Sequence, residues 1–528
     1  MRPFAALLDR LTHTPQRNAK LRLITGYLGA APDPDRGYAI AAITRDLDIA
    51  SVKPAMLRAL VAERVDAELF ALSYDYVGDL AETVALIWPR TEVPVAEPPS
   101  LSEVVSRLQA TSRREAPQVV EALLDRLGPS ERYALLKLVT GGLRVGVSAR
   151  LAKQALAHFG GVDVTEIEEL WHGLAPPYEA LFAWLTGAAQ KPVQAAACPF
   201  RPVMLATPLE EAELERLDPA EYLAEWKWDG IRVQASAERG RRRLYSRTGD
   251  DISGAFPDLV EGMDFSGTLD GELLVMRPDR TVAPFADLQQ RLNRKTVSAR
   301  HLERFPAFLR AYDLLLDGET DRRPEGFAAR RGHLEAFVAG LDPGRFDLSP
   351  LIDFAGWEEL ARLRNAPPHP VIEGLMLKHR ESAYVPGRPK GPWFKWKRDP
   401  HLIDAVLMYA QRGHGKRSGY YSDYTFGVWD DEGLVPVGKA YFGFTDEELR
   451  EIDRFVRNNT TERFGPVRAV RADRDKGLVL EVAFEGLNRS TRHKSGVAMR
   501  FPRIARLRWD KPPAEADRIE TLRAMLPP

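Results

Sequence analysis

Glu225-Trp-Lys-Trp-Asp-Gly-Ile-Arg232 is the stretch of this 528-residue chain that says most about its fold. It places Lys227 in a Lys-x-Asp-Gly string between Trp226 and Trp228. On its own the string is weak, because three fixed positions arise by chance in roughly one in ten to twenty chains of this length. The simplest interpretation is a strand that carries a surface lysine and ends in a type I′ Asp-Gly turn.

Further short strings follow downstream. They are Ser246-Arg-Thr-Gly249, Leu269-Asp-Gly-Glu272, Ala311-Tyr-Asp313, Ile372-Glu-Gly-Leu-Met-Leu-Lys378, Trp393-Phe-Lys-Trp-Lys397 and Arg500-Phe-Pro-Arg-Ile-Ala-Arg-Leu-Arg-Trp-Asp-Lys511. Residues two apart on a strand share a face, so Lys395 and Lys397 present their ammonium groups on the same side. Glu272 and Glu373 offer carboxylates, which are hard oxygen ligands of the kind that Mg²⁺ binds. The strings therefore predict a site for a metal and a phosphate.

In this order the strings resemble the collinear motifs of the covalent nucleotidyltransferase superfamily, which contains DNA ligases, RNA ligases and mRNA-capping enzymes. The last string looks specifically like ATP-dependent DNA ligases. The resemblance covers residues 200–528, and Leu143-Arg-Val-Gly-Val-Ser148 extends it more loosely into the N-terminal part. Glu485-Gly-Leu-Asn-Arg-Ser490 and His493-Lys-Ser-Gly496 are similar to the bacterial branch, whose members usually act in repair beside a replicative NAD-dependent ligase.

The resemblance implies that Lys227 takes AMP from ATP, releases pyrophosphate and passes the AMP to the 5′-phosphate of a nick in duplex DNA. The 3′-hydroxyl then displaces the AMP and closes the nick. A lysine amine must be neutral to attack, yet only about one part in a thousand is neutral near pH 7.4. The flanking tryptophans, the cations Lys395 and Lys397 and a bound metal are expected to lower the pKa of Lys227.

The resemblance also assigns the nucleotide-binding residues. Glu225 is expected to read the adenine or its neighbourhood, and Tyr312 to stack on the adenine ring unless it is a core aromatic. Arg232 and Arg247 are expected to hold the ribose and phosphates, and later the nick phosphate.

Two acids complete this set. Glu272 and Glu373 are expected to bind Mg²⁺ or Mn²⁺ and the ribose hydroxyl. Lys395 and Lys397 are expected to contact the α-phosphate.

Other basic residues have looser assignments. Arg500, Arg503 and Lys511 are expected to close over ATP and orient the pyrophosphate leaving group. Arg388 is either a phosphate contact or part of a basic surface loop. Arg144 and Ser148 are expected to touch the DNA backbone from the N-terminal part.

Apolar periodicity divides the chain into three predicted domains. Residues 1–190 read as an all-α DNA-binding domain, with helices at 118–127 and at 131–139, the second capped by Ser130. Residues 200–398 alternate short strands, among them 222–228 and 267–275, with helices. They are expected to form an α+β nucleotidyltransferase domain of two packed sheets, similar to ATP-grasp proteins. Residues 400–528 are rich in short strands with one helix at 445–456, which suits a β-barrel of the OB-fold type.

Composition excludes several classes of protein. Cys198 is the only cysteine, so the chain has neither an internal disulfide nor the cysteine zinc site of NAD-dependent ligases. The net charge of −1 is low for a DNA-binding protein, but residues 378–398 and 489–511 are each rich in Lys and Arg with a single acid. With no signal peptide and no run of eighteen apolar residues, the expectation is a cytoplasmic monomer that is not bound to a membrane.

Two alternatives stay open. An RNA ligase or a capping-type guanylyltransferase shares the early strings, but the Arg-Phe-Pro-Arg string and the large helical region argue against both. A catalytically dead clamp that binds nicks would not need Lys227 together with Glu272 and Glu373.

Overall fold

The structure, a computed structural model, describes residues 1–77, 79–89, 97–194, 196–292, 294, 296–413, 419–491 and 493–526. It divides into two compact units, one comprising residues 1–164, 175–192 and 400–528, and the other comprising residues 165–174 and 193–399. The division into three domains at 1–190, 200–398 and 400–528 stays a prediction. None of the helices in the described ranges is long and apolar enough to cross a bilayer.

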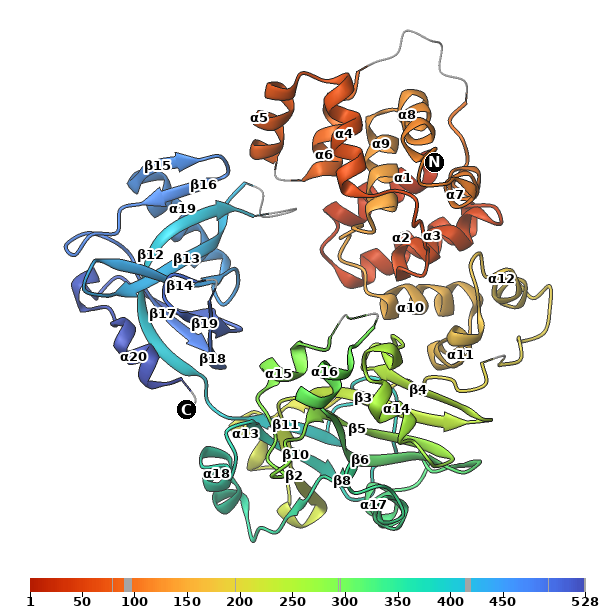
Figure 1. The fold of residues 1–528 in the computed structure, drawn as a ribbon, viewed down its shortest axis with the longest axis vertical. Coiled ribbons are helices and arrows are strands. Elements are labelled where there is room, and N and C mark those ends of the chain that lie inside the picture. Colours follow the sequence, from red (N-terminus) through yellow and green to blue (C-terminus); the bar gives the residue numbers. More distant parts are fainter. Residues whose placement is uncertain are drawn as a thin grey trace. The chain divides into compact units, whose positions relative to one another are not determined.

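The N-terminal part is helical, as predicted (Figure 1). Its helices are α1 (Arg2–His13), α2 (Arg17–Ala30), α3 (Asp35–Thr44), α4 (Pro54–Arg64), α5 (Ala67–Val77), α6 (Leu80–Ile87), α7 (Leu101–Ala110), α8 (Ala116–Arg126), α9 (Pro129–Thr140), α10 (Ala149–Gly160), α11 (Val164–Leu170) and α12 (Glu179–Leu185). The prediction that Ser130 caps a helix is wrong. α9 begins at Pro129 with Gly128 as its N-cap, because proline at the first helical position has no N–H that needs a partner.

The second unit is built on two sheets (Figure 1). The five-stranded sheet has the order β1 (Thr207–Pro208), β11 (Trp393–Lys397), β10 (Ile372–His379), β2 (Tyr222–Trp228) and β9 (Leu351–Ile352). The six-stranded sheet has the order β4 (Arg241–Ser246), β3 (Ile231–Glu238), β5 (Gly267–Val275), β6 (Ala307–Asp317) and β7 (Thr320–Asp321), with β8 (Phe346–Leu348) parallel to β6. The strands predicted at 222–228 and 267–275 are confirmed with the same bounds.

The Asp-Gly pair after Lys227 does not form the hairpin turn that the simplest interpretation expected. β2 pairs with β9 and β10, whereas β3 pairs with β4 and β5, so the chain passes from one sheet to the other at Asp229 and Gly230. A Cβ added at Gly230 would lie 2.6 Å from the carbonyl oxygen of Leu273 and 2.7 Å from Cγ of Glu272. Glycine is therefore required here because β5 approaches the backbone closely.

Helices cover the sheets of this unit. They are α13 (Glu211–Leu214), α14 (Pro257–Glu261), α15 (Phe285–Gln289), α16 (Ala299–Arg304), α17 (Phe327–Ala339) and α18 (Trp357–Asn365). α17 packs along β6 and β8 and buries Phe327 and Leu334, while α18 lies against β10 and buries Leu360. Apolar side chains of β6 (Leu315), β10 and β11 meet in a common cluster, so the two sheets share a buried contact.

The C-terminal part is rich in strands, as predicted. They are β12 (His401–Arg412), β13 (Tyr421–Trp429), β14 (Leu434–Ala440), β15 (Thr460–Phe464), β16 (Val467–Val470), β17 (Val479–Phe484), β18 (Gly486–Arg489), β19 (Val497–Arg500) and β20 (Arg503–Arg508), with α20 (Ile519–Ala524) near the end. The predicted helix is α19 (Asp446–Asn459), which Thr445 and Glu448 open with a capping box. The OB-fold assignment stays a prediction.

Candidate active site

Lys227 lies near the end of β2, beside β10. Its ammonium donates to the Glu373 carboxylate, with Nζ and Oε2 2.5 Å apart. The register of β10 shifts between Ile372 and Gly374, so Glu373 sits at a bulge opposite Lys227. Gly374 has a φ of 149°, and a Cβ there would lie 2.3 Å from the carbonyl oxygen of Trp396. The bulge therefore needs glycine, and it directs the Glu373 carboxylate to Lys227.

The charge state of Lys227 differs from the expectation. Burial favours the neutral amine, but the neighbouring carboxylates, Glu373 foremost, outweigh burial and raise the pKa of Lys227 above its ordinary value. Burial likewise disfavours the ionised Glu373, but Lys227 and Lys397 lower the pKa of Glu373 below its ordinary value. The expected lowering of the Lys227 pKa is thus wrong, and Lys227 is held as an ammonium.

The two tryptophans also act differently from the expectation. Neighbouring residues on a strand point to opposite faces, so Trp226 and Trp228 face away from the Lys227 ammonium. Trp226 packs against the core of the five-stranded sheet. The ring of Trp228 lies under the Arg310 guanidinium, with Cζ 4.2 Å from its centroid. Both tryptophans thus fix the strand and do not form the apolar surroundings of the amine.

Glu272 is the second acid of the site. It lies in β5 opposite Arg232 of β3, and burial raises its pKa to about 8. No group of three or more His, Cys, Asp and Glu side chains within the described residues is arranged to hold a metal by itself. A pair of carboxylates without soft ligands fits Mg²⁺ or Mn²⁺, which usually takes its remaining ligands from water and substrate phosphates.

A group of cations forms beside these acids. Burial and the positive charges of Arg232 and Arg388 lower the pKa of Arg247. Burial and the charges of Arg388 and Lys397 lower the pKa of Lys395. Like charges held this close raise one another's electrostatic energy, and a bound anion relieves that cost. The structure thus brings the predicted phosphate contacts together, Arg388 included.

Arg232 is more constrained than a phosphate clamp would require. Its Nε and Nη2 donate to the two Asp270 oxygens at 3.0 and 2.6 Å, and its Nη1 donates to the Met204 carbonyl at 2.6 Å. Nη2 also donates to the Tyr384 hydroxyl at 3.1 Å. These bonds use four of the five guanidinium N–H groups, which leaves one for a ligand.

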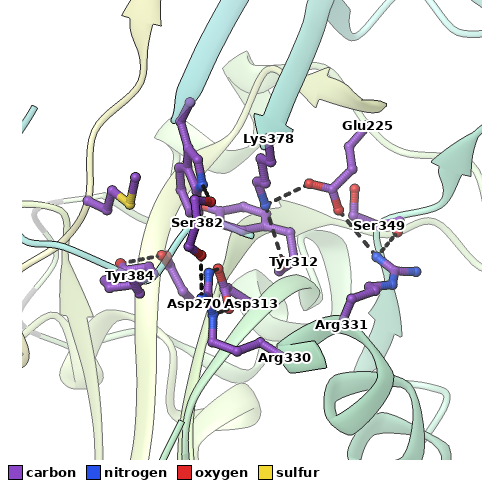
Figure 2. Close-up of polar contacts among 12 residues, drawn as sticks. Glu225, Asp270, Tyr312, Asp313, Arg330, Arg331, Ser349, Lys378, Ser382 and Tyr384 are labelled. Carbon is purple, nitrogen blue, oxygen red and sulfur yellow. Dashed lines mark hydrogen bonds and ion pairs between the residues drawn. The ribbon is translucent and has the colours of Figure 1, made fainter. Parts of the chain in front are cut away.

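Glu225 is buried and Tyr312 is partly buried in one layer of the same unit (Figure 2). The Tyr312 ring, on β6, lies 4.6 Å from the ammonium of Lys378. Glu225 is 1% exposed, and its carboxylate is paired with Lys378 at 2.6 Å and with Arg331 at 3.2 Å. Adenine stacking on Tyr312 stays a prediction. Adenine reading by Glu225 also stays a prediction.

Among the residues of this layer that had no assigned role in the sequence analysis are Asp270, Arg331, Lys378 and Tyr384. Asp270 and Lys378 stand inside two of the quoted strings, and Lys378 ends a run of apolar residues in a strand, where a charge must be paired to be buried. This pattern indicates that Lys378 has a buried partner of opposite charge, but it does not identify that partner. Arg331 and Tyr384 lie outside the strings and carried no signal.

Arg144 and Ser148 lie in the turn that leads into α10. The Ser148 hydroxyl accepts a hydrogen bond from the backbone N–H of Leu151 at 3.2 Å, so it caps this helix. The buried ammonium of Lys20 donates to the carbonyls of Val145 and Gly146 at 2.6 and 3.1 Å and holds the turn. The structure therefore gives Ser148 a structural task, and the DNA contact of both predicted residues stays a prediction.

Arg500, Arg503 and Lys511 belong to the C-terminal part, in a different unit from Lys227. Arg500 ends β19, and Arg503 starts β20, where it lies opposite Ala483. Lys511 Nζ is 2.7 Å from Oδ2 of Asp404. Their expected action on ATP stays a prediction.

Known families match most of the chain. Residues 1–157 match the model of the DNA ligase N terminus, residues 203–397 match the ATP dependent DNA ligase domain, and residues 417–511 match the ATP dependent DNA ligase C terminal region. The middle match spans Lys227 and the acids and cations around it.

Individual proteins are similar over almost the whole length. A "Probable DNA ligase" of Koribacter versatilis is 32% identical, over 98% of this chain and 95% of that protein. "DNA ligase 1" of Korarchaeum cryptofilum is 30% identical, over 99% of this chain and 97% of that protein. The solved structure Pmar-Lig_Pre has a TM-score of 0.60 at 16% identity, covers 96% of this chain and 99% of its own, and shows a shared fold. This chain is an enzyme of the ATP-dependent DNA ligase family.

Proposed function

We propose that this enzyme seals nicks in duplex DNA through a lysyl-AMP on Lys227 and a DNA-adenylate. The observation that carries the proposal is the ion pair between Lys227 and Glu373. A second acid, Glu272, and a group of cations that includes Lys395 lie close enough to influence the charges of this pair. A nucleophile, ligands for a hard metal ion and a polyphosphate site are the parts that transfer of a nucleotidyl group requires.

In the first step the Lys227 amine forms a bond to the α-phosphorus of ATP, the bond to the β-phosphate oxygen breaks, and pyrophosphate leaves. The ammonium must first lose its proton to solvent, which reaches the partly exposed side chain, and Glu373 opposes that loss while it is paired with Lys227. Glu272 and Glu373 would hold Mg²⁺ or Mn²⁺, which would supply positive charge for the phosphates. ATP is the AMP donor, and Lys395 and Lys397 hold its α-phosphate.

In the later steps the AMP moves to the 5′-phosphate of the nick, and the 3′-hydroxyl then attacks that phosphorus while AMP leaves. Arg247 and Arg388 hold the phosphate that is being transferred or attacked. Arg232, with one free N–H, contributes a single further contact.

The remaining parts of the chain serve DNA. We assign residues 1–190 to DNA binding, with Arg144 near the backbone of the duplex, and residues 400–528 to an OB-fold that brings Arg500, Arg503 and Lys511 to the pyrophosphate. The resemblance of the strings 485–490 and 493–496 to the bacterial branch of the family supports a role in repair or recombination.

The test is a covalent label. The protein is incubated with ATP labelled at the α-phosphate and with Mg²⁺, and the labelled peptide is mapped. A phosphoramidate on Lys227 survives hydroxylamine and is lost in acid, and a Lys227→Ala variant takes no label. A label on another lysine, or labelling that persists in Lys227→Ala, would refute the proposal.

A further inference from the structure

Lys378 is a second buried lysine close to the site, and the reaction proposed above gives it no task. It ends the string 372–378 in β10, its side chain is 1% exposed, and Glu225 is 2.6 Å from its Nζ. A buried ammonium is costly unless it is paired and surrounded by compensating groups. This cost implies that its position matters for the unit that contains it.

The ammonium joins the two sheets of the unit. Nζ donates to the Glu225 carboxylate of β2 and, at 3.2 Å, to the backbone carbonyl of Tyr312 of β6. Figure 2 shows Lys378 between these two residues, with an interaction drawn to each. The rest of its surroundings is aromatic: the ring centroids of Tyr312, Phe327 and Trp393 lie 4.6, 4.5 and 4.6 Å from Nζ. Cation–π attraction orients the Tyr312 ring, and the hydrogen bond to the Tyr312 carbonyl holds its backbone.

The partner on β2 is placed to transmit this contact. Glu225 and Lys227 are two residues apart on one strand, so they share a face and move together. Arg331 of α17 holds Glu225 from its other side, and the preceding residue, Arg330, pairs with Asp313 of β6 at 2.8 Å. The strand of Lys227 and the strand of Tyr312 are thus tied to each other and to one helix.

We propose that Lys378 is a positioning residue, which sets the strand of Tyr312 against the strand of Lys227 so that a nucleotide stacked on Tyr312 presents its α-phosphate to the amine. This inference rests on the proposed function. Lys378 does not touch the reacting atoms. It acts through Tyr312 on one side and through Glu225 on the other. The ring that receives the base is therefore fixed relative to the nucleophile before ATP binds.

The variant Lys378→Met removes the charge and keeps an unbranched side chain that is one heavy atom shorter. Glu225 retains Arg331 as a partner, so the carboxylate is not left without a cation. We expect the single-turnover rate of Lys227 adenylation at saturating ATP and Mg²⁺ to fall between roughly tenfold and a hundredfold per folded molecule, because small misplacement of reacting groups costs that much.

A double-mutant cycle with Tyr312→Leu separates positioning from general stability. If Lys378 acts through Tyr312, Lys378→Met costs less than about threefold in the Tyr312→Leu background, since the ring that it orients is already absent. A Lys378→Arg variant keeps the pair with Glu225, but its planar guanidinium does not fit the surroundings of a compact ammonium, so an intermediate rate is expected. If Lys378→Met does not fold, the cycle is run with Lys378→Arg.

Lys137→Met is the matched control. Lys137 is also buried, is paired with Asp79 and lies 5.4 Å from the Tyr133 ring, but it belongs to α9 in the other unit. This variant should lose stability and keep its adenylation rate per folded molecule. Additive effects in the cycle, or an unchanged rate in Lys378→Met, would overturn the inference. Failure of the wild-type protein to take AMP would instead overturn the proposed function.

Discussion

The charge of Lys227 depends most on one carboxylate, and the change Glu373→Gln removes the charge of that carboxylate while keeping the shape of the side chain. Nζ of Lys227 and Oε2 of Glu373 are 2.5 Å apart, and Glu373 contributes most among the acids that raise the pKa of Lys227. Burial, which favours the neutral amine, remains in the variant. The pKa of Lys227 should therefore fall when this carboxylate is lost.

The structure bounds the size of this change. Unit charges about 4 Å apart attract by about 4 kcal/mol at the effective dielectric constant of a site near the protein surface. The side chains of Lys227 and Glu373 are 23% and 20% exposed, so water screens part of this attraction. Because about 1.4 kcal/mol corresponds to one pKa unit, we expect the pKa of Lys227 to fall by roughly one to two units.

Chemical reactivity measures this pKa without any nucleotide. Acetic anhydride modifies only neutral amines, so the labelling rate of the Lys227 peptide follows the neutral fraction, and it should rise roughly tenfold to a hundredfold at pH 8 in Glu373→Gln. Lys53 in the same digest is the internal reference, because it is an exposed lysine of the other unit. A Lys227 profile that does not move, or that moves to higher pH, would refute the reasoning.

Three further predictions concern the metal and the C-terminal residues. Burial raises the pKa of Glu272 to about 8, so the ionisation of Glu272 destabilises the fold as the pH rises from about 5 to 8. Over that range Glu272→Gln should gain up to about 3 kcal/mol in free energy of unfolding relative to wild type. A difference between the two proteins that is independent of pH would contradict this. EDTA should stop adenylation and Mg²⁺ or Mn²⁺ should restore it, whereas full activity in EDTA would exclude a metal role for the acids. Arg503→Ala combined with Lys511→Ala should slow Lys227 adenylation by two to three decades, which corresponds to the roughly 3–4 kcal/mol of a strong electrostatic donor. The same variant should spare closure of a pre-adenylated nick. Equal losses in both single-turnover rates would assign these residues to DNA binding or to the fold.

Local patterns predicted the strands of the central unit well but did not predict which strands pair. β2 and β5 have the bounds that their composition indicated. The Asp-Gly pair at 229–230 suggested a hairpin, because that dipeptide favours tight turns. In the structure the pair connects two sheets, and Gly230 is needed for the approach of β5, which lies some forty residues downstream and leaves no local trace. The short strands β15, β16, β18 and β19 were also missed, since four or five residues carry little periodicity.

In the site, too, the sequence predicted the residue types but not the surroundings of each residue. The strings predicted that Lys227, Glu272 and Glu373 act together, and the structure places them in mutual electrostatic reach. The predicted lowering of the Lys227 pKa failed, because a strand pattern does not reveal that a bulge turns Glu373 onto the amine. The pairing of Lys378 with Glu225 was missed for a similar reason: it joins side chains from distant parts of the chain in a buried layer.

The most direct test of the whole account is the identity of the AMP acceptor. Wild-type protein is incubated with α-labelled ATP and Mg²⁺, chased with a nicked duplex, and followed by peptide mapping and by gel analysis of the DNA. The account predicts an acid-labile phosphoramidate on Lys227 that disappears as labelled AMP passes to the 5′-phosphate of the nick, and a Lys227→Ala variant that closes a pre-adenylated nick but not a nick supplied with ATP. Sealing from ATP by Lys227→Ala, or a label that maps to any other residue, would contradict it.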